Sequence, residues 1–92
     1  MLRAGTRRNV AGYTFFFERR DAGPARLGLL VTRKHATRAS DRNRIKRSIR
    51  EAFRLEQEKL GSVDLLVRPP YGIRPSTQMT MRLRQLFTGL GK

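Results

Sequence analysis

The sequence has no cysteine, few acidic residues and no long apolar segment. Without cysteine, disulfide bonds and cysteine-based zinc sites are excluded. No apolar run approaches the roughly 20 residues that span a bilayer. The first ten residues also lack the apolar stretch of a signal peptide. These absences predict a soluble, cytoplasmic protein with no membrane partner.

Positive charge is what the sequence has in excess. It carries 21 Lys and Arg residues against 7 acids, a formal net charge of +14 at pH 7. Half of that net charge falls between residues 33 and 54, where Asp41 and Glu51 are the only acids. A basic surface of this density is typical of proteins that bind nucleic acid.

The chain length of 92 residues suits one small domain, and the apolar patterns predict five elements in it. Strands are expected at residues 13–18, 26–33 and 63–67, and helices from Ser40 or Asp41 to about Lys59 and from Pro75 or Ser76 onward. The order β-β-α-β-α predicts a two-layer α/β (α+β) sandwich as a single domain of residues 1–92. The first two strands are expected to form an antiparallel hairpin, and residues 1–10 to be flexible.

The first predicted helix is amphipathic. Its apolar side consists of Ile45, Ile49, Ala52 and Phe53. The remaining surface is basic, and two interpretations of it stay open. It could be a solvated face held by pairs such as Arg47–Glu51 and Arg54–Glu58, or it could be a nucleic-acid interface. Because solvated faces usually mix both signs of charge, and most bases here lack a local acid, the pattern favours nucleic acid.

A motif in this helix resembles a known family. The run Arg42-Asn43-Arg44-Ile45-Lys46-Arg47, followed by Arg50-Glu51 and Phe53, is similar to the signature of the bacterial ribonuclease P protein subunit. The stretch from Leu27 to Lys34 resembles the strand before that signature, and the stretch from Asp64 to Val67 resembles the strand after it. The resemblance covers about residues 9–90.

The resemblance implies both a function and a fold. Family members bind the catalytic RNA of ribonuclease P, and the holoenzyme removes the 5′ leader from precursor tRNA. The RNA performs this magnesium-dependent hydrolysis. The protein is therefore implied to be a non-catalytic subunit of an endoribonuclease, and the protein alone is implied to bind no Mg²⁺. The leader is implied to lie in a cleft between the signature helix and the sheet. A left-handed β-α-β crossover is also implied, although right-handed crossovers are the strong default.

The resemblance assigns the basic side of the helix and the end of the second strand to RNA binding. Asn43 stays open, since it could instead hydrogen-bond the backbone near the helix start. Glu51 is expected to orient Arg47 or Arg54. No catalytic or metal-ligating residue is expected, and the lone His35 has no second histidine or cysteine with which to share a metal ion. The expected RNA-binding residues are Arg33, Lys34, Arg42, Asn43, Arg44, Lys46, Arg47, Arg50 and Arg54.

Aromatic residues of the first strand are candidates for the leader cleft. Tyr13, Phe15 and Phe17 share one strand face. They either line the cleft, where bases stack at about 1–3 kcal/mol each, or enter the core. Phe16 lies on the other face and is expected in the core. Tyr71 is expected to pack locally in a proline-rich turn.

Two departures from the family pattern concern the leader. About a dozen residues precede Tyr13, too few for the N-terminal helix that is usual in the family, so that helix is expected to be absent. Arg68-Pro69-Pro70 stands where the family more often has basic residues and glycine. Both changes affect the expected recognition of the leader more than the expected binding of the catalytic RNA.

Other functional classes compete with this interpretation. Composition alone would favour a small ribosomal protein, and the ordered signature reverses that preference. A DNA-binding module is disfavoured because no helix precedes the basic one to form a helix-turn-helix. A protein-only nuclease is disfavoured because the 7 acids are scattered along the sequence instead of being grouped for two metal ions.

Overall fold

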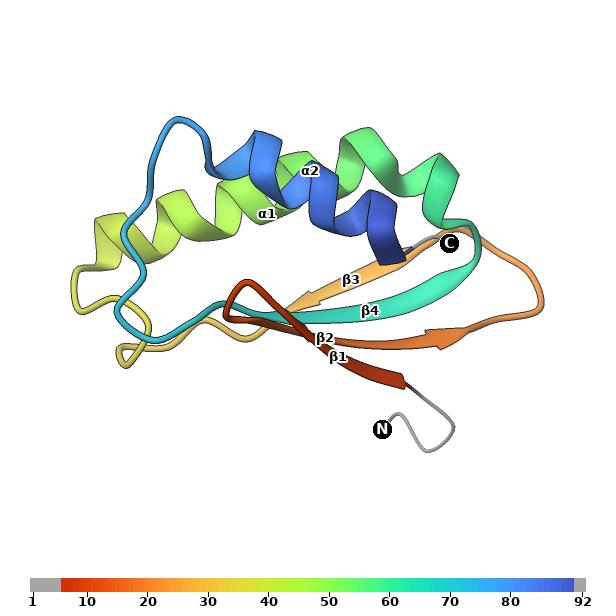
Figure 1. Ribbon diagram of the computed structural model, residues 1–92, viewed down its shortest axis with the longest axis horizontal. Helices are drawn as coiled ribbons and strands as arrows, with labels where there is room; N and C mark the ends of the chain where they lie inside the picture. The colour runs from red at the N-terminus through yellow and green to blue at the C-terminus, as the bar shows by residue number, and fades with distance from the viewer. Residues whose placement is uncertain (1–5, 91–92) are drawn as a thin grey trace.

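Six secondary-structure elements form two layers in the computed structural model, which describes residues 6–90 (Figure 1). One sheet carries both helices on the same face, and both helices begin at the same end of the molecule. This is the predicted α+β sandwich with one additional strand. The elements are β1 (Thr6–Val10), β2 (Tyr13–Arg19), β3 (Arg26–Leu29), α1 (Ala39–Leu60), β4 (Val63–Arg68) and α2 (Met79–Leu90).

The strands are ordered β1-β2-β4-β3 across the sheet. β2 is antiparallel to both β1 and β4, whereas β3 is parallel to β4. The predicted hairpin of residues 13–18 and 26–33 is therefore wrong, because β4 lies between these two strands. β4 is the most apolar strand, with Val63, Leu65 and Val67 all buried on one face. A central position suits such a strand, since it is then paired along both edges.

The connection from β3 through α1 to β4 is a crossover between two parallel neighbours. α1 lies on the helical face of the sheet. When the sheet is viewed from the helical face with β3 and β4 pointing upward, β4 lies to the left of β3 (Figure 1). The crossover is left-handed, as the family resemblance implied and against the general preference.

The core lies between the sheet and the two helices. Ile45 and Ile49 of α1, Leu83 and Phe87 of α2, and Phe15 of β2 are fully buried there. The Phe87 ring packs edge-on against Phe15, with ring centroids 5.8 Å apart, a preferred geometry for aromatic pairs. The apolar stripe that predicted α1 is therefore the side by which this helix is fixed to the sheet.

The N-terminal segment differs from the expectation of flexibility. Thr6–Val10 forms β1, and Ala11 and Gly12 connect it to β2 with φ angles of 53° and 84°. Two successive positive φ angles are the mark of the tight turn that matches hairpin twist. Residues 1–5 lie outside the described part of the chain. The expectations of flexibility and of a missing N-terminal helix are therefore not tested for these five residues.

The element boundaries also differ in places. α1 starts at Ala39, one or two residues before the predicted cap, and its N-cap residue Arg38 makes no side-chain capping hydrogen bond. β3 ends at Leu29, earlier than predicted, because the chain turns into the loop that leads to α1. α2 starts at Met79, one turn after Ser76. α1 ends at Leu60, and the N–H of its C-cap residue Gly61 donates to the Gln57 carbonyl.

Candidate nucleic-acid interface

The solvent side of α1 carries the predicted basic residues. Its core side is held by Ile45, Ile49 and Ala52, each without exposed surface, so the opposite side is presented rigidly to solvent. Part of this surface encloses a shallow hollow of about 410 Å³. We call the polar and basic residues of this surface, all exposed except the half-buried Lys46, the basic ridge. It consists of Asn43, Arg44, Lys46, Arg47 and Arg50.

The cations of the basic ridge are not neutralised within the chain. Across residues 6–90, the ion pairs involve Arg20, Arg26, Arg54, Lys59 and Arg84, and none involves a ridge residue. A purely solvated face would be expected to pair its bases at i,i+4. The predicted Arg47–Glu51 pair does not form. The ridge therefore presents a positive surface that has no acid of its own.

Arg54 differs from the ridge. Its guanidinium lies 2.6 Å from Glu51 Oε1, one turn back along the helix. This hydrogen bond lowers the pKa of Glu51 and raises that of Arg54. Glu51 thus orients Arg54, one of the two partners expected for it, and Arg54 would meet an RNA phosphate with its charge already partly compensated.

Arg42 and Asn43 differ in burial and in hydrogen bonding. Arg42 is half-buried, and its Nη1 donates to the carbonyls of Ala36 and Thr37, both at 3.0 Å. It holds the loop before α1 in place while keeping its full charge. Asn43 is exposed, and its side chain makes no hydrogen bond to any residue in the range 6–90. The structure therefore supports a surface position for Asn43 and not a backbone cap.

Arg33 and Lys34 lie in the loop after β3, where both are exposed. They line a hollow of about 500 Å³ together with Arg68 and Tyr71. Tyr71 packs locally as predicted, stacked on His35 with ring centroids 4.8 Å apart, but 63% of it remains exposed. Cations and an exposed aromatic ring thus meet at the end of the sheet.

His35 has a structural role in this loop. It is 2% exposed, and its Nδ1 accepts a hydrogen bond from the Thr32 N–H at 2.8 Å. Burial lowers the pKa of His35, and the positive charge of Arg68 lowers it further. The ring is therefore neutral near pH 7. Within residues 6–90 no three His, Asp or Glu side chains gather into a possible metal site.

Of the two positions left open for Tyr13, Phe15 and Phe17, the structure shows the core. Tyr13 and Phe15 are 4% and 0% exposed beneath the helices, and Phe17 packs against the same core. Neither Tyr13 nor Phe15 offers a ring face to a base. Phe16, which was expected in the core, lies on the sheet face away from the helices. The prediction of a leader cleft between α1 and the sheet is also wrong, because core side chains fill that space.

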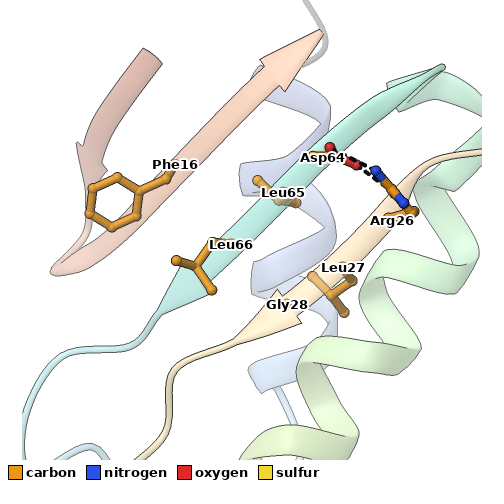
Figure 2. Close-up of a pocket in the computed structure, with 7 residues that line it drawn as sticks. All are labelled: Phe16, Arg26, Leu27, Gly28, Asp64, Leu65 and Leu66. Carbon is orange, nitrogen blue, oxygen red and sulfur yellow. Dashed lines mark hydrogen bonds and ion pairs between the residues drawn. The ribbon is translucent and has the colours of Figure 1, made fainter. Parts of the chain in front are cut away.

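A wide hollow lies instead on the open face, the sheet face away from both helices (Figure 2). It measures about 510 Å³, and Phe16, Gly28 and Leu66 line it from three different strands. Arg26 and Asp64 border it as an ion pair, with Arg26 Nε 2.8 Å from Asp64 Oδ1. Gly28 has no side chain to fill the hollow, and a Cβ at this position would lie 3.2 Å from Leu66 Cδ1. We call this site the open-face hollow.

A signal for this orientation was present in the sequence. Phe16 alternates with Thr14 and Glu18, whereas Tyr13, Phe15 and Phe17 form a wholly apolar face. The more apolar face of a strand is the one expected to enter the core. Strand parity therefore favours exposure of Phe16. Tyr71 gives no comparable signal, because its exposure depends on how two distant loops meet.

No helix within residues 6–90 combines the length and the apolar character that crossing a bilayer requires. Of the acids, Glu51, Glu56 and Asp64 are each bonded to an arginine. The candidate site thus combines the unpaired cations of the basic ridge, the cationic hollow at the end of the sheet and the open-face hollow.

Comparison with known proteins places this chain in a family. A family profile described as ribonuclease P matches residues 1–91. The ribonuclease P protein component of Nitrosococcus oceani is 40% identical over 91 residues, which cover 97% of this chain and 76% of that protein. The component from Idiomarina loihiensis is 42% identical over 74 residues, covering 78% of this chain and 59% of that protein.

Solved structures show the same fold. The RNase P protein from Thermotoga maritima matches with a TM-score of 0.62 at 24% identity, over 95% of this chain and 74% of that one. The Staphylococcus aureus RNase P protein matches with a TM-score of 0.63 at 21% identity, over 94% and 73%. The family profile extends over nearly the whole chain and includes the basic ridge. The chain belongs to the family of bacterial ribonuclease P protein components.

Proposed function

We propose that the chain binds the catalytic RNA of ribonuclease P through the basic ridge and acts as the protein subunit of that enzyme. The observation that carries this proposal is the set of exposed, unpaired cations on a helix whose other side is fixed in the core. Such a rigid positive surface can neutralise several phosphates at once. Arg33 and Lys34 extend the contact at the end of the sheet, and Arg42 adds its charge from the loop before α1.

The mechanism proposed is electrostatic docking with recognition of RNA shape. RNA helices are contacted through phosphates and 2′-hydroxyls more than through base edges. Hydrolysis, with its Mg²⁺ ions, belongs to the RNA, and the substrate is precursor tRNA that loses its 5′ leader in the cytoplasm. The protein supplies no reacting group. Its part is to stabilise the folded RNA and to hold the substrate. The family assignment excludes the ribosomal-protein alternative.

The ridge is tested by changing Arg47 and Arg50 to Ala together. Because each phosphate contact contributes to counterion release, the slope of log K against log salt should fall by about two. Affinity for the catalytic RNA should fall about a hundredfold or more, as expected for two charge-assisted hydrogen bonds. Filter binding at salt concentrations from about 50 to 200 mM measures both the affinity and its salt dependence.

The matched control changes Arg7 and Arg8 to Ala. Both residues are exposed on β1, so the variant has the same net charge but keeps the ridge intact. If the two variants lose affinity equally, binding follows overall charge and the ridge is not the interface. Melting temperatures of both variants equal to that of the parent would show that the fold is preserved.

We also propose that the 5′ leader of precursor tRNA binds in the open-face hollow. Three features support this: the Phe16 ring is accessible, the hollow is apolar, and Arg68 borders the same face. Single-stranded nucleotides bind by stacking bases on aromatic rings within a positive groove. The other face of the sheet cannot serve, because the helices cover it.

Changing Phe16 to Ala tests this second surface. Removing one stacked base should weaken binding of leader-containing precursor tRNA about fivefold to a hundredfold, while binding of mature tRNA to the holoenzyme stays unchanged. Met81→Ala is the control, because Met81 is an exposed apolar side chain on α2 and lies outside the open-face hollow. Equal losses for precursor and mature tRNA would place the leader elsewhere.

A further inference from the structure

A second polar hollow, of about 260 Å³, opens beside the N-terminus of α2. It is formed where the turn between β1 and β2 meets the segment between β4 and α2. Among its lining residues are Arg74, Ser76, Gln78 and Arg82, together with Tyr13 from β2. No carboxylate lines it. None of the sequence patterns pointed to a site here.

The Tyr13 side chain is buried, yet its hydroxyl has no partner. The residue is 4% exposed and its ring stacks against Phe15, with centroids 6.0 Å apart. Within residues 6–90 the hydroxyl makes no hydrogen bond, although a buried tyrosine hydroxyl usually finds one. Arg82 lines the same hollow as Tyr13. Burial raises the pKa of Tyr13, and the positive charge of Arg82 acts to lower it. The side chain as a whole is buried, and its hydroxyl is left as an unpaired donor at the edge of a cationic hollow.

The start of α2 adds backbone donors to this hollow. A helix N-terminus leaves up to four N–H groups without helical partners and carries a partial positive charge. α2 has no acidic residue in its first turn, whereas α1 has Asp41 there. Arg74 and Arg82 are exposed, and neither forms an ion pair with any residue in the described range. The positive potential is therefore not compensated by the protein.

We propose that this hollow binds one backbone phosphate of the RNA partner, with Tyr13 and Arg82 as direct ligands. The inference rests on the proposed function. Phosphate oxygens accept hydrogen bonds and carry the charge that a helix N-terminus and two guanidinium groups attract. A base is less suited, because the Tyr13 ring is stacked on Phe15 and presents its hydroxyl to the site. Both helices begin at this end of the molecule (Figure 1), so one RNA could reach the ridge and the hollow together.

The test uses the full-length chain bound to the catalytic RNA, with Tyr13→Phe, Arg82→Ala and the double variant. Tyr13→Phe keeps the core ring and removes only the donor, so affinity should fall about threefold, within the net worth of one hydrogen bond. Arg82→Ala should reduce affinity about fivefold or more and lower the salt slope by about one. Because both groups would hold the same phosphate, the double variant should lose less than the product of the single losses.

Arg8→Ala is the charge-matched control, since Arg8 is exposed on β1. The proposal fails if Tyr13→Phe binds like the parent and Arg82→Ala behaves like Arg8→Ala. That result is distinguishable from failure of the proposed function. In the first case the Arg47 and Arg50 double variant still loses affinity, and in the second the parent chain itself does not bind the catalytic RNA.

Discussion

The two halves of α1 share one apolar stripe but use their charges differently. From Ala39 to Arg50 the helix has five bases and one acid, and the bases on its solvent side are unpaired. From Glu51 to Leu60 it has two bases and three acids, and both bases form ion pairs. A charge that a partner must reach stays free of protein neighbours, whereas a charge that serves the fold is given one.

Glu56 shows what the second half does with its charge. The side chain is 2% exposed between the helices, with Arg84 Nε 2.8 Å and Thr88 Oγ1 3.0 Å from its two oxygens. The hydrogen bond from Arg84 lowers the pKa of Glu56. A buried carboxylate requires such partners, because an isolated one would be strongly disfavoured. The second half of α1 therefore fastens α2, whereas the ridge cations of the first half form no ion pair within residues 6–90.

The largest effect that could break this comparison is expected at Ile49. Ile49→Ala should reduce the free energy of unfolding by about 2–5 kcal/mol, because the residue is fully buried beneath the ridge. Affinity of the folded fraction for the catalytic RNA should not change. Urea unfolding gives the stability, and binding is measured at a temperature where the variant is folded.

The neighbouring Arg50 provides the contrast. Arg50→Ala should leave stability within about 0.5 kcal/mol of the parent, as is usual for exposed positions, and should weaken RNA binding. If Arg50→Ala instead unfolds the protein as Ile49→Ala does, the ridge is part of the folding core, and the separation between binding and folding charges is lost.

The sequence predicted the elements better than their pairing. The apolar stripe located α1 to within one or two residues, because helical periodicity is a local property. β1 was missed because Thr6, Arg7, Arg8 and Asn9 are polar and exposed, so the strand exists only by pairing with β2. The insertion of β4 between β2 and β3 likewise depends on contacts between distant segments. Neither fact is written in a local pattern.

The candidate site divides in the same way. The basic ridge could be predicted, since its residues share one helix and lie outside its apolar stripe. The exposure of Phe16 could have been predicted from strand parity, because polar Thr14 and Glu18 flank it. The hollow beside α2 could not, because it joins a β-turn near residue 12 to a loop near residue 75. Sites built on one element can be found in a sequence, and sites built between elements require the fold.

The smallest effect, and the sharpest test of the comparison, is expected at Glu51. This residue lies at the boundary between the halves and holds Arg54 at 2.6 Å. Glu51→Gln removes one negative charge and releases Arg54 toward the ridge, so affinity for the catalytic RNA should rise about two- to fivefold, in line with the small worth of exposed ion pairs. Filter binding at low salt, where screening is weakest, measures it.

Glu58→Gln makes the same change of charge on the same helix, but Glu58 forms no ion pair with any residue between 6 and 90. If only overall charge mattered, the two variants would bind RNA equally well. If Arg54 matters once it is released, Glu51→Gln should bind more tightly and show the steeper dependence on salt. Equal affinities would mean that Arg54 lies beyond the RNA and that the interface ends at Arg50. A difference would extend the interface by one turn and show that a single carboxylate sets its limit.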